Sequence, residues 1–342
     1  MSRRGATLLL GSVLLALLAI GSAKLPVPYA ILGPGPTVNT VGKYEGKPVI
    51  TVTGRPVSSS KGHLNLTTVS VTDNITLLQG MRAWFDRSYA VVPRESVFPP
   101  DQTTKQVDAA NAAEFRSSQN SAELAAMAEL HYPLQVVVSE VKKDAAVHGV
   151  LRAGDVIAAV DGIPVTTGPK LTAQIRAKSP GDPVTIRYLR GGNATVVTVR
   201  TGKLPDDPKR AALGVLVEQK PAAPLKISFD INNIGGPSAG LMFSLGIVDF
   251  LTPADLTGGR FIAGTGTIDD TGKVGPIGGI HQKLVAARAA GATVFLTPAD
   301  NCAEARNGAP SGLRLVKVTS LHDALSSLDK VRSGDSALPS CG

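Results

Sequence analysis

The segment FDINNIGGPSAGLMFSLGIVDF, Phe229 to Phe250, decides the fold of the last third of the chain. A strand-like run ends in Gly235-Gly236-Pro237, and an apolar helix is predicted from Ser238 to about Phe250. Pro237 suits a first helical turn, where its missing N–H costs nothing, and the glycines allow a tight turn. The pattern therefore predicts Ser238 at a helix N-terminus, where free amides stabilise a developing oxyanion. A serine that only caps a buried helix produces the same pattern.

A serine nucleophile needs a base, and two candidates lie in GTGTIDDTGKVGPIGGIHQKLVAARAAG, which begins at Gly264. The part IHQKLVAARAAG is predicted to be an amphipathic helix. Desolvation by neighbouring Ala and Leu would lower the pKa of Lys283 and leave a free amine to take the serine proton. His281 is the rival base, and the two side chains point about 200° apart on a helix. From these residues alone the choice stays open, and Asp269 and Asp270 have the pattern of turn residues.

The motifs GGPSAG and KVGPIGGIHQK resemble, in order and spacing, the two signature motifs of the Lon protease domain, a Ser-Lys dyad peptidase. The resemblance spans roughly residues 204–331. It implies Ser238 as nucleophile and Lys283 as base. It also implies supporting roles near the dyad for Thr265, which would hydrogen-bond the lysine, and for Gly235, Gly236 and Pro237. Two positions depart from the family, because many Lon proteases have acidic residues where this chain has Gly235 and Thr267.

Between about Pro133 and Gly202 the chain resembles a PDZ domain. The resemblance rests on LQVVVSEV, GVLRAGDVIAAVDGIPV, LTAQIRAK and the hairpin PVTIRYLRGGNATVVTVRTG. PDZ domains bind an extended peptide as an added strand at a sheet edge. The resemblance implies a groove formed by Leu134, Gln135, Val136, Val137 and Val138 on a strand and by Leu171 and Ile175 on a helix. The residues 132–135 match the usual carboxylate-binding loop poorly, so internal peptide segments are also candidate ligands. A PDZ domain that serves only as an intramolecular spacer is the alternative.

The N-terminus predicts the compartment. Arg3 and Arg4 precede an uncharged apolar run, residues 5–23, which favours a retained transmembrane helix with a cytoplasmic N-terminus and extracytoplasmic domains. A cleaved signal peptide ending at Gly21-Ser22-Ala23 is the competing interpretation. Cys302 and Cys341 do not fit a metal site and would be free to form a disulfide outside the cytoplasm.

The composition excludes several classes of function. The 342 residues have a formal charge of +8, but the basic residues are scattered and no nucleic-acid motif occurs, so a basic surface beside an anionic membrane is expected. The segment 266–274 fails the spacing of a phosphate-binding loop. We therefore expect neither ATP, nor another cofactor, nor a metal. Trp84 and Phe85 are expected to pack in a core, within a segment that shows strand patterns over 49–71 and a helical pattern over 105–130.

Together these features predict an α+β multidomain protein. The expected parts are residues 1–24, a cytoplasmic tip and transmembrane anchor; 25–130, a linker and α/β segment; 131–203, the PDZ domain; 204–333, the Lon-like proteolytic domain; and 334–342, a tail. This combination resembles bacterial membrane-anchored PDZ–Lon proteins. The resemblance implies an ATP-independent serine endopeptidase that cleaves unfolded or flexible extracytoplasmic proteins, with a peptide ligand for the PDZ domain and a homo-oligomeric ring as further expectations. A non-catalytic PDZ scaffold and a small-molecule kinase with a Gly-Ser-Ala phosphate loop are the rival functions.

Overall fold

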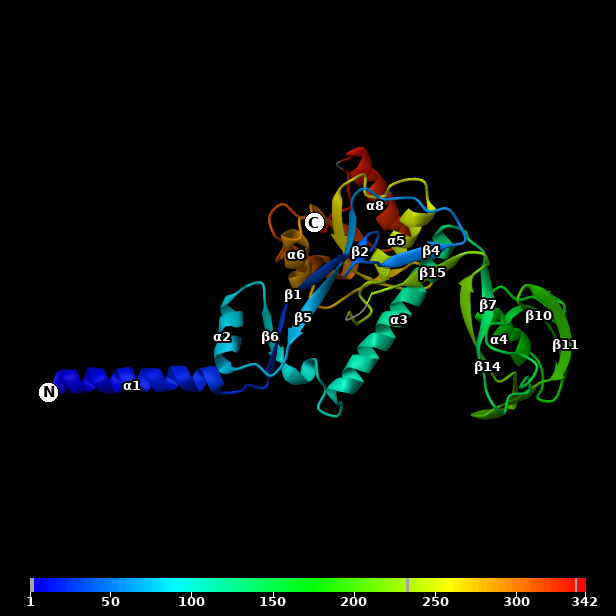
Figure 1. Ribbon diagram of the computed structural model, residues 1–342, viewed down its shortest axis with the longest axis horizontal. Coiled ribbons are helices and arrows are strands. Elements are labelled where there is room, and N and C mark those ends of the chain that lie inside the picture. The colour runs from blue at the N-terminus through cyan, green and yellow to red at the C-terminus, as the bar shows by residue number, and fades with distance from the viewer. Residues whose placement is uncertain (1–2, 232–233, 336) are drawn as a thin grey trace. The chain divides into compact units, whose positions relative to one another are not determined.

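The computed structural model describes residues 3–231, 234–335 and 337–342, and Figure 1 shows its helices and strands. The chain forms two compact units. The larger unit consists of Met1–Val52, Pro56–Ala126 and Ile227–Gly342, and the smaller unit of Thr53–Arg55 and Met127–Lys226. The larger unit therefore combines the N-terminal segment with the last third of the chain, two regions that the sequence pattern treated separately.

A six-stranded mixed sheet is the centre of the larger unit. Its order is β20 (Arg314–Val318), β19 (Val294–Pro298), β16 (Phe261–Gly264), β5 (His63–Thr72), β1 (Tyr29–Asn39) and β6 (Ala90–Pro93). The strands from β20 to β5 are parallel, whereas β1 is antiparallel to both β5 and β6. All five residues of β19 are buried, as expected for a parallel strand covered on both faces. The first and last parts of the chain thus each contribute three strands to one sheet.

Two helices of the larger unit matter most for the site. α5 (Gly240–Leu251) is apolar on every side, and its residues from Gly240 to Asp249 are all buried, as its sequence predicts. α3 (Thr104–Glu129) packs against it through the edge-to-face rings of Phe115 and Phe243, whose centroids lie 5.6 Å apart. The long helix predicted over 105–130 is therefore confirmed, and its packing partner is the helix that follows Ser238.

Shorter elements complete the larger unit. They are β2 (Lys43–Tyr44), β3 (Lys47–Pro48), β4 (Ile50–Thr53), α2 (Leu77–Phe85), η1 (Arg94–Ser96), β15 (Lys226–Phe229), β17 (Thr267–Ile268), β18 (Val274–Gly275), α6 (Ile280–Ala289), η2 (Ala299–Asn301), α7 (Cys302–Arg306) and α8 (Leu321–Ser333). Trp84 and Phe85, at the end of α2, are 76% and 83% exposed. The prediction that they pack in a core is wrong, because α2 presents only Ala83 to the interior.

The N-terminal apolar run forms the helix α1 (Arg3–Lys24). Seven Leu and Val side chains between Leu9 and Leu18 are 48% to 69% exposed. Within the part of the chain that the structure describes, no helix has the length and apolar character needed to cross a membrane. The predicted transmembrane anchor is therefore not confirmed.

The smaller unit is built around a six-stranded sheet. The sheet order is β11 (Asn193–Arg200), β10 (Pro183–Arg190), β8 (Val156–Val160), β7 (Leu134–Val141) and β14 (Val215–Pro221), with β9 (Ile163–Pro164) paired to β8. The helix α4 (Gly168–Arg176) and the hairpin of β12 (Gly202–Leu204) and β13 (Asp207–Ala212) complete it. One core of mostly aliphatic side chains, including Val136, Ile157 and Ile186, fills its interior. Residues beyond the expected boundary at 203 thus supply the last strand of this sheet.

Cys302 and Cys341 form a disulfide. The bond joins the start of α7 to the C-terminal tail, which the backbone bridge between Val316 and Ser340 also holds against the sheet. The tail therefore belongs to the larger unit.

Candidate functional site

Ser238 lies in the turn just before α5. Its carbonyl oxygen accepts hydrogen bonds from Gly266 N at 2.9 Å and from Thr265 Oγ1 at 3.1 Å. Both donors follow β16, so the central sheet positions the serine from one side. The helix that follows is buried from Gly240 to Asp249, and Ser238 lies in the wall of a cavity.

Lys283 is the residue that meets the Ser238 hydroxyl. It lies in the first turns of α6, where its side chain is 3% exposed, and its Nζ is 2.9 Å from Ser238 Oγ. Gly279 begins this helix with φ +67°, a conformation that favours glycine, and a Cβ there would meet Val69 at 2.7 Å. Gly279 thus allows the helix to start close against β5, and Lys283 lies buried one turn later.

Burial lowers the pKa of Lys283 from its usual 10.5 to about 7. The cause is desolvation, because the charged ammonium loses water around it and gains no carboxylate partner. A substantial fraction of the lysine is therefore the neutral amine at neutral pH, which is the form able to accept a proton.

Thr265 fixes the direction of the amine. It is fully buried, and its Oγ1 lies 3.1 Å from Lys283 Nζ. The hydroxyl has one proton, which it donates to the Ser238 carbonyl, so toward Lys283 it acts as an acceptor of an N–H. An amine whose N–H points at Thr265 has its lone pair available for the Ser238 hydroxyl.

The other titratable candidates lie elsewhere. His281 places its Nε2 2.6 Å from the carbonyl oxygen of Arg87, and so it contacts the segment after α2 and not Ser238. Asp269 accepts hydrogen bonds from Thr271 and Lys273 within its own turn, as a turn residue does. Asp270 accepts from Ser121 Oγ. Of the two bases that the sequence left open, the structure brings Lys283 to the serine.

The sequence interpretation missed the part that α3 plays in this site. Asn111 O accepts from Gly236 N at 3.0 Å, and Ser118 Oγ donates to the carbonyl of Pro237 at 3.0 Å. A Cβ on Gly235 would lie 3.0 Å from the Asn111 side chain, so this loop passes close to α3. The glycines and proline before Ser238 are thus held by a helix more than a hundred residues earlier. The sequence of α3 carries no catalytic motif that would have indicated this.

A cavity of about 740 Å³ opens at the serine. Ser238 and Lys283 contribute to its wall together with Thr267, residues 276–278 and residues 68–71 of β5. β5 pairs with β16 only over residues 63–66, and beyond them its partner among the described strands is β1. One edge of β5 therefore faces the cavity, and an extended main chain fits beside such an edge.

The smaller unit has a different hollow from the one predicted. β7 is paired on one side with β8 and on the other with β14, from Val215↔Val141 to Pro221↔Leu134. The prediction that Leu134, Gln135, Val136, Val137 and Val138 form the peptide groove is therefore wrong, because β7 has no free edge to offer. The chain's own β14 occupies that position and is the edge strand of the sheet.

A cavity of about 290 Å³ lies between α4 and β14. Leu171 and Ile175, the two predicted groove residues on the helix, do line it, together with residues 213–217. Gly214 has φ +76°, and a Cβ there would come within 2.8 Å of the Ala145 backbone, so this turn into β14 requires glycine. The sequence offered a signal in Leu213-Gly214-Val215, a glycine between apolar residues before a strand, but it lies after the boundary drawn at 203.

Comparisons with known proteins agree with both units. Residues 110–201 match the family model of the PDZ domain, and residues 233–328 match that of the Lon protease (S16) C-terminal proteolytic domain. The Lon protease of Azospirillum brasilense is 38% identical over 93 residues, which cover 26% of this chain and 11% of that protein. The Lon protease of Phenylobacterium zucineum is 37% identical over 103 residues, or 29% of this chain and 13% of that protein. The matches therefore span a small fraction of these relatives.

Two solved PDZ domains are similar in sequence to part of this chain. The PDZ domain of an SdrC-like protein from Listeria monocytogenes is 27% identical, with a TM-score of 0.23, over 24% of this chain and 85% of that one. The corresponding domain from Listeria innocua is 28% identical, with a TM-score of 0.23, over 25% of this chain and 93% of that one.

The two family matches define a chain that carries a PDZ domain and a proteolytic domain of the Lon (S16) type. The resemblance predicted from the sequence is confirmed for both domains, and the combination is consistent with a PDZ–Lon-like protease. The Lon match supports a serine-type peptidase.

Proposed function

We propose that this protein is an ATP-independent serine endopeptidase in which Ser238 is the nucleophile and Lys283 the general base. The observation that carries the proposal is the 2.9 Å contact between a buried lysine amine and a serine hydroxyl at the wall of a cavity. The lowered pKa of Lys283 and its contact with Thr265 support the same roles.

The reaction follows from this geometry. Lys283 takes the proton of Ser238 as Oγ attacks a substrate carbonyl, and the resulting ammonium gives this proton to the leaving amine as the peptide bond breaks. Water, deprotonated by the same amine, then attacks the acyl-enzyme carbonyl, and the ammonium returns this proton to Ser238 Oγ as the ester bond breaks and the acid is released. Gly236 N is engaged by Asn111 O, so we assign the oxyanion to the amides at the N-terminus of α5, at Ser238 and Ala239.

The cavity suggests an extended polypeptide as substrate. An unfolded segment would lie beside the edge of β5 and place one carbonyl at Ser238, with main-chain hydrogen bonds that do not depend on sequence. Val69, Val71 and Ile277 make part of the wall apolar, so we expect apolar side chains next to the scissile bond. A substrate that is already unfolded needs no ATP-driven unfolding.

We further propose that the cavity between α4 and β14 binds a peptide as an added strand and recruits substrates. β14 offers the edge, and Leu171, Ile175 and Leu216 offer apolar contacts. Ring formation, which the Lon resemblance suggests, stays a prediction that analytical ultracentrifugation of the intact chain tests.

We propose an extracytoplasmic location for both units. The basic residues before the apolar N-terminal run favour export whether that run is retained or cleaved. The Cys302–Cys341 disulfide supports an oxidising compartment, since such bonds are rare in the cytoplasm. A protease-accessibility assay on intact cells and on lysed cells tests this, and protection of both units in intact cells stripped of any outer membrane would contradict it.

The decisive test is hydrolysis of an unfolded protein, without ATP, by the chain from Leu25 onward. Wild type is compared with Ser238→Ala and Lys283→Met, each checked for folding by circular dichroism. Loss of cleavage in both variants is expected. An active Lys283→Met variant would remove Lys283 as the base, and an inert but folded wild type would favour the scaffold alternative. Nucleotide binding at the Ser238 loop would favour the kinase alternative.

A further inference from the structure

α2 exposes its large apolar side chains to solvent. Met81, Trp84 and Phe85 lie at positions i, i+3 and i+4 and so share one face of the helix. They are 49%, 76% and 83% exposed. Soluble proteins seldom leave two aromatic side chains so bare on adjacent positions of one short helix, and such patches mark contact sites. We call these three residues the α2 patch.

The rest of α2 is firmly held, so the exposure is built into the fold. Thr76 and Gln79 form a reciprocal capping box at its N-terminus. On its inner side Ala83 packs with Ile31 and Ile75. The outward direction of the α2 patch is therefore fixed by the contacts on the opposite side.

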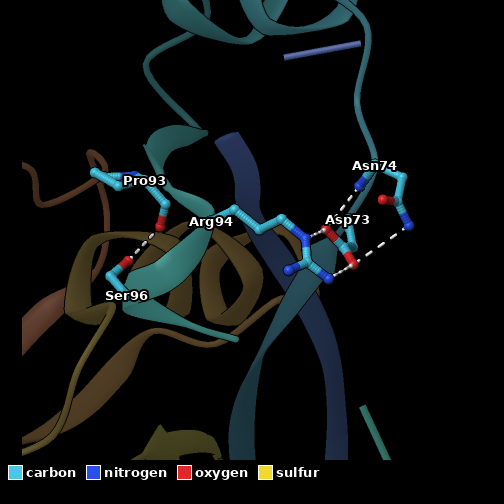
Figure 2. A network of polar contacts seen from close by, with 5 residues as sticks. All are labelled: Asp73, Asn74, Pro93, Arg94 and Ser96. Carbon is cyan, nitrogen blue, oxygen red and sulfur yellow. Dashed lines mark hydrogen bonds and ion pairs between the residues drawn. The ribbon is translucent and has the colours of Figure 1, made fainter. Parts of the chain in front are cut away.

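An ion pair fixes the segments on either side of α2. Figure 2 shows Arg94, just after β6, reaching Asp73, just after β5, through two hydrogen bonds of 2.8 and 2.9 Å. The paired guanidinium lowers the pKa of the Asp73 carboxyl and keeps it charged. Both ends of the connection from β5 to β6, which carries α2, are thereby joined to each other.

The surroundings of the α2 patch match one kind of partner. The start of α2 is bonded to the chain that leaves α1, since Leu77 N donates to Leu25 O at 2.9 Å, and Leu77 shares an apolar hollow with Leu14 and Leu18 of α1. The exposed leucines of α1 thus continue the apolar surface. The exposed side chains of Lys24, Arg82 and Arg87 add positive charge near the ends of α1 and α2, and Asp86 is an exposed acidic residue directly after α2.

We propose that the α2 patch inserts into the interfacial region of an anionic lipid bilayer. Aromatic side chains prefer this region, and a short helix with apolar and basic residues lies there with its apolar face about 5–10 Å deep. Two adjacent elements, α1 and α2, supply the two attachments that stable binding of a peripheral surface requires. α2 would then hold the larger unit against the bilayer. Residues 73–76 separate α2 from the end of β5, which borders the cavity at Ser238.

Trp84 makes the proposal directly measurable, because it is the only tryptophan of the chain. The intact chain, carrying Ser238→Ala to prevent self-cleavage, is bound to vesicles of phosphatidylcholine and phosphatidylglycerol. Insertion predicts a blue shift of the emission, quenching by lipids brominated near the glycerol end of the acyl chains, and loss of quenching by aqueous iodide. Emission that iodide still quenches and brominated lipid does not, or a chain that does not float with the vesicles, overturns the proposal.

Variants separate α2 from α1. Phe85→Asp should shift the equilibrium from inserted to solvent-exposed Trp84 about tenfold, since it replaces a buried aromatic contact with a charge. Val196→Asp, at a 63% exposed site on β11, is the matched control and should leave the emission unchanged. Equal quenching in both variants would overturn the proposal.

The same assay tests two further points: whether the positive charges contribute to binding, and whether a second copy of the chain covers the α2 patch in place of lipid. The double variant Arg82→Glu and Arg87→Glu should lose quenching in anionic vesicles and retain the wild-type level in neutral ones. Iodide protection that grows with protein density, without quenching by brominated lipid, would identify a second copy of the chain as the partner and would overturn the lipid assignment.

Discussion

Two hollows of this protein, the first at Ser238 and the second between α4 and β14, share an exposed strand edge but differ in what lies beside it. The first hollow, in the larger unit, borders the edge of β5, and its wall includes Ser238 and the buried amine of Lys283. The second hollow, in the smaller unit, borders the edge of β14, and its wall includes aliphatic residues of α4 and charged side chains such as Lys142 and Asp144. A strand edge alone can hold a peptide, whereas a strand edge beside a desolvated base can also cleave it.

The largest effect is expected from a substitution that removes the proposed base of the first hollow and leaves the second hollow unchanged. Lys283→Met keeps the length of the side chain and removes the base, so the rate of peptide hydrolysis should fall by about 10⁴-fold or more. Peptide affinity at the cavity between α4 and β14 should not change. A coupled measurement of both properties checks this, and loss of peptide binding together with hydrolysis would show that the substitution disturbs the fold.

The pH dependence sharpens the contrast, because the proposed base of the first hollow, Lys283, has its pKa lowered by burial. With the Lys283 pKa at about 7, kcat/KM should rise about tenfold per pH unit below 7 and level off above it. Peptide binding at the second hollow should be flat over the same range. A rate that falls as the pH rises through 7 would contradict a lysine base.

The same shift makes the protein more stable at higher pH. The folded-state pKa of Lys283 lies below the usual 10.5, so between these values the unfolded chain binds more protons and the free energy of unfolding rises with pH. The gain is about 2 kcal/mol between pH 7 and 9. Asp249, whose burial raises its pKa to about 6, completes its titration below this window. Denaturant titrations should show the gain in wild type and not in Lys283→Met.

The motifs GGPSAG and GGIHQK contain the two residues of the proposed dyad, but the residues alone left His281 and Lys283 open as the base, and only the resemblance to the Lon domain favoured Lys283. The strand and helix patterns also located β5, α3 and α5 closely. The sequence could not show that α3 holds the Ser238 loop, because Asn111 acts through its backbone carbonyl and any residue supplies one. It also could not show that β14 covers the edge of β7, because strand partners far apart along the chain are fixed by topology and not by local pattern.

Trp84 and Phe85 illustrate a further limit. Aromatic residues are usually at least partly buried, so an interior position was the natural prediction. The exposed face of α2 follows from the capping box and the packing of Ala83, which orient the helix, and neither is visible without the fold. The exposed surface that results is the α2 patch, on which the lipid proposal rests.

Substitution of Thr265 tests whether its hydroxyl orients the Lys283 amine. Thr265→Val keeps the shape of the side chain but removes the hydroxyl that accepts from Lys283 Nζ and donates to the Ser238 carbonyl, so kcat should fall about tenfold or more, equivalent to one or two hydrogen bonds. Thr265→Ser is the matched control and should restore most of the rate. Steady-state kinetics on a short peptide measures both, and an unchanged kcat in Thr265→Val would mean that the threonine does not orient the amine.

The smallest effect is expected from the second hollow. Leu216→Asp replaces a half-exposed apolar side chain in the wall of the α4–β14 cavity, so KM for an unfolded protein should rise about fivefold. The kcat/KM for a short peptide that fits only the first hollow should stay constant, because Leu216 lines the cavity of the smaller unit and does not line the cavity at Ser238. Val196→Asp makes a similar apolar-to-acidic change at an exposed position that does not line this cavity, and it should alter neither value. If Leu216→Asp left KM for the unfolded protein unchanged, the smaller unit would be a spacer, and cleavage would depend on the edge of β5 alone.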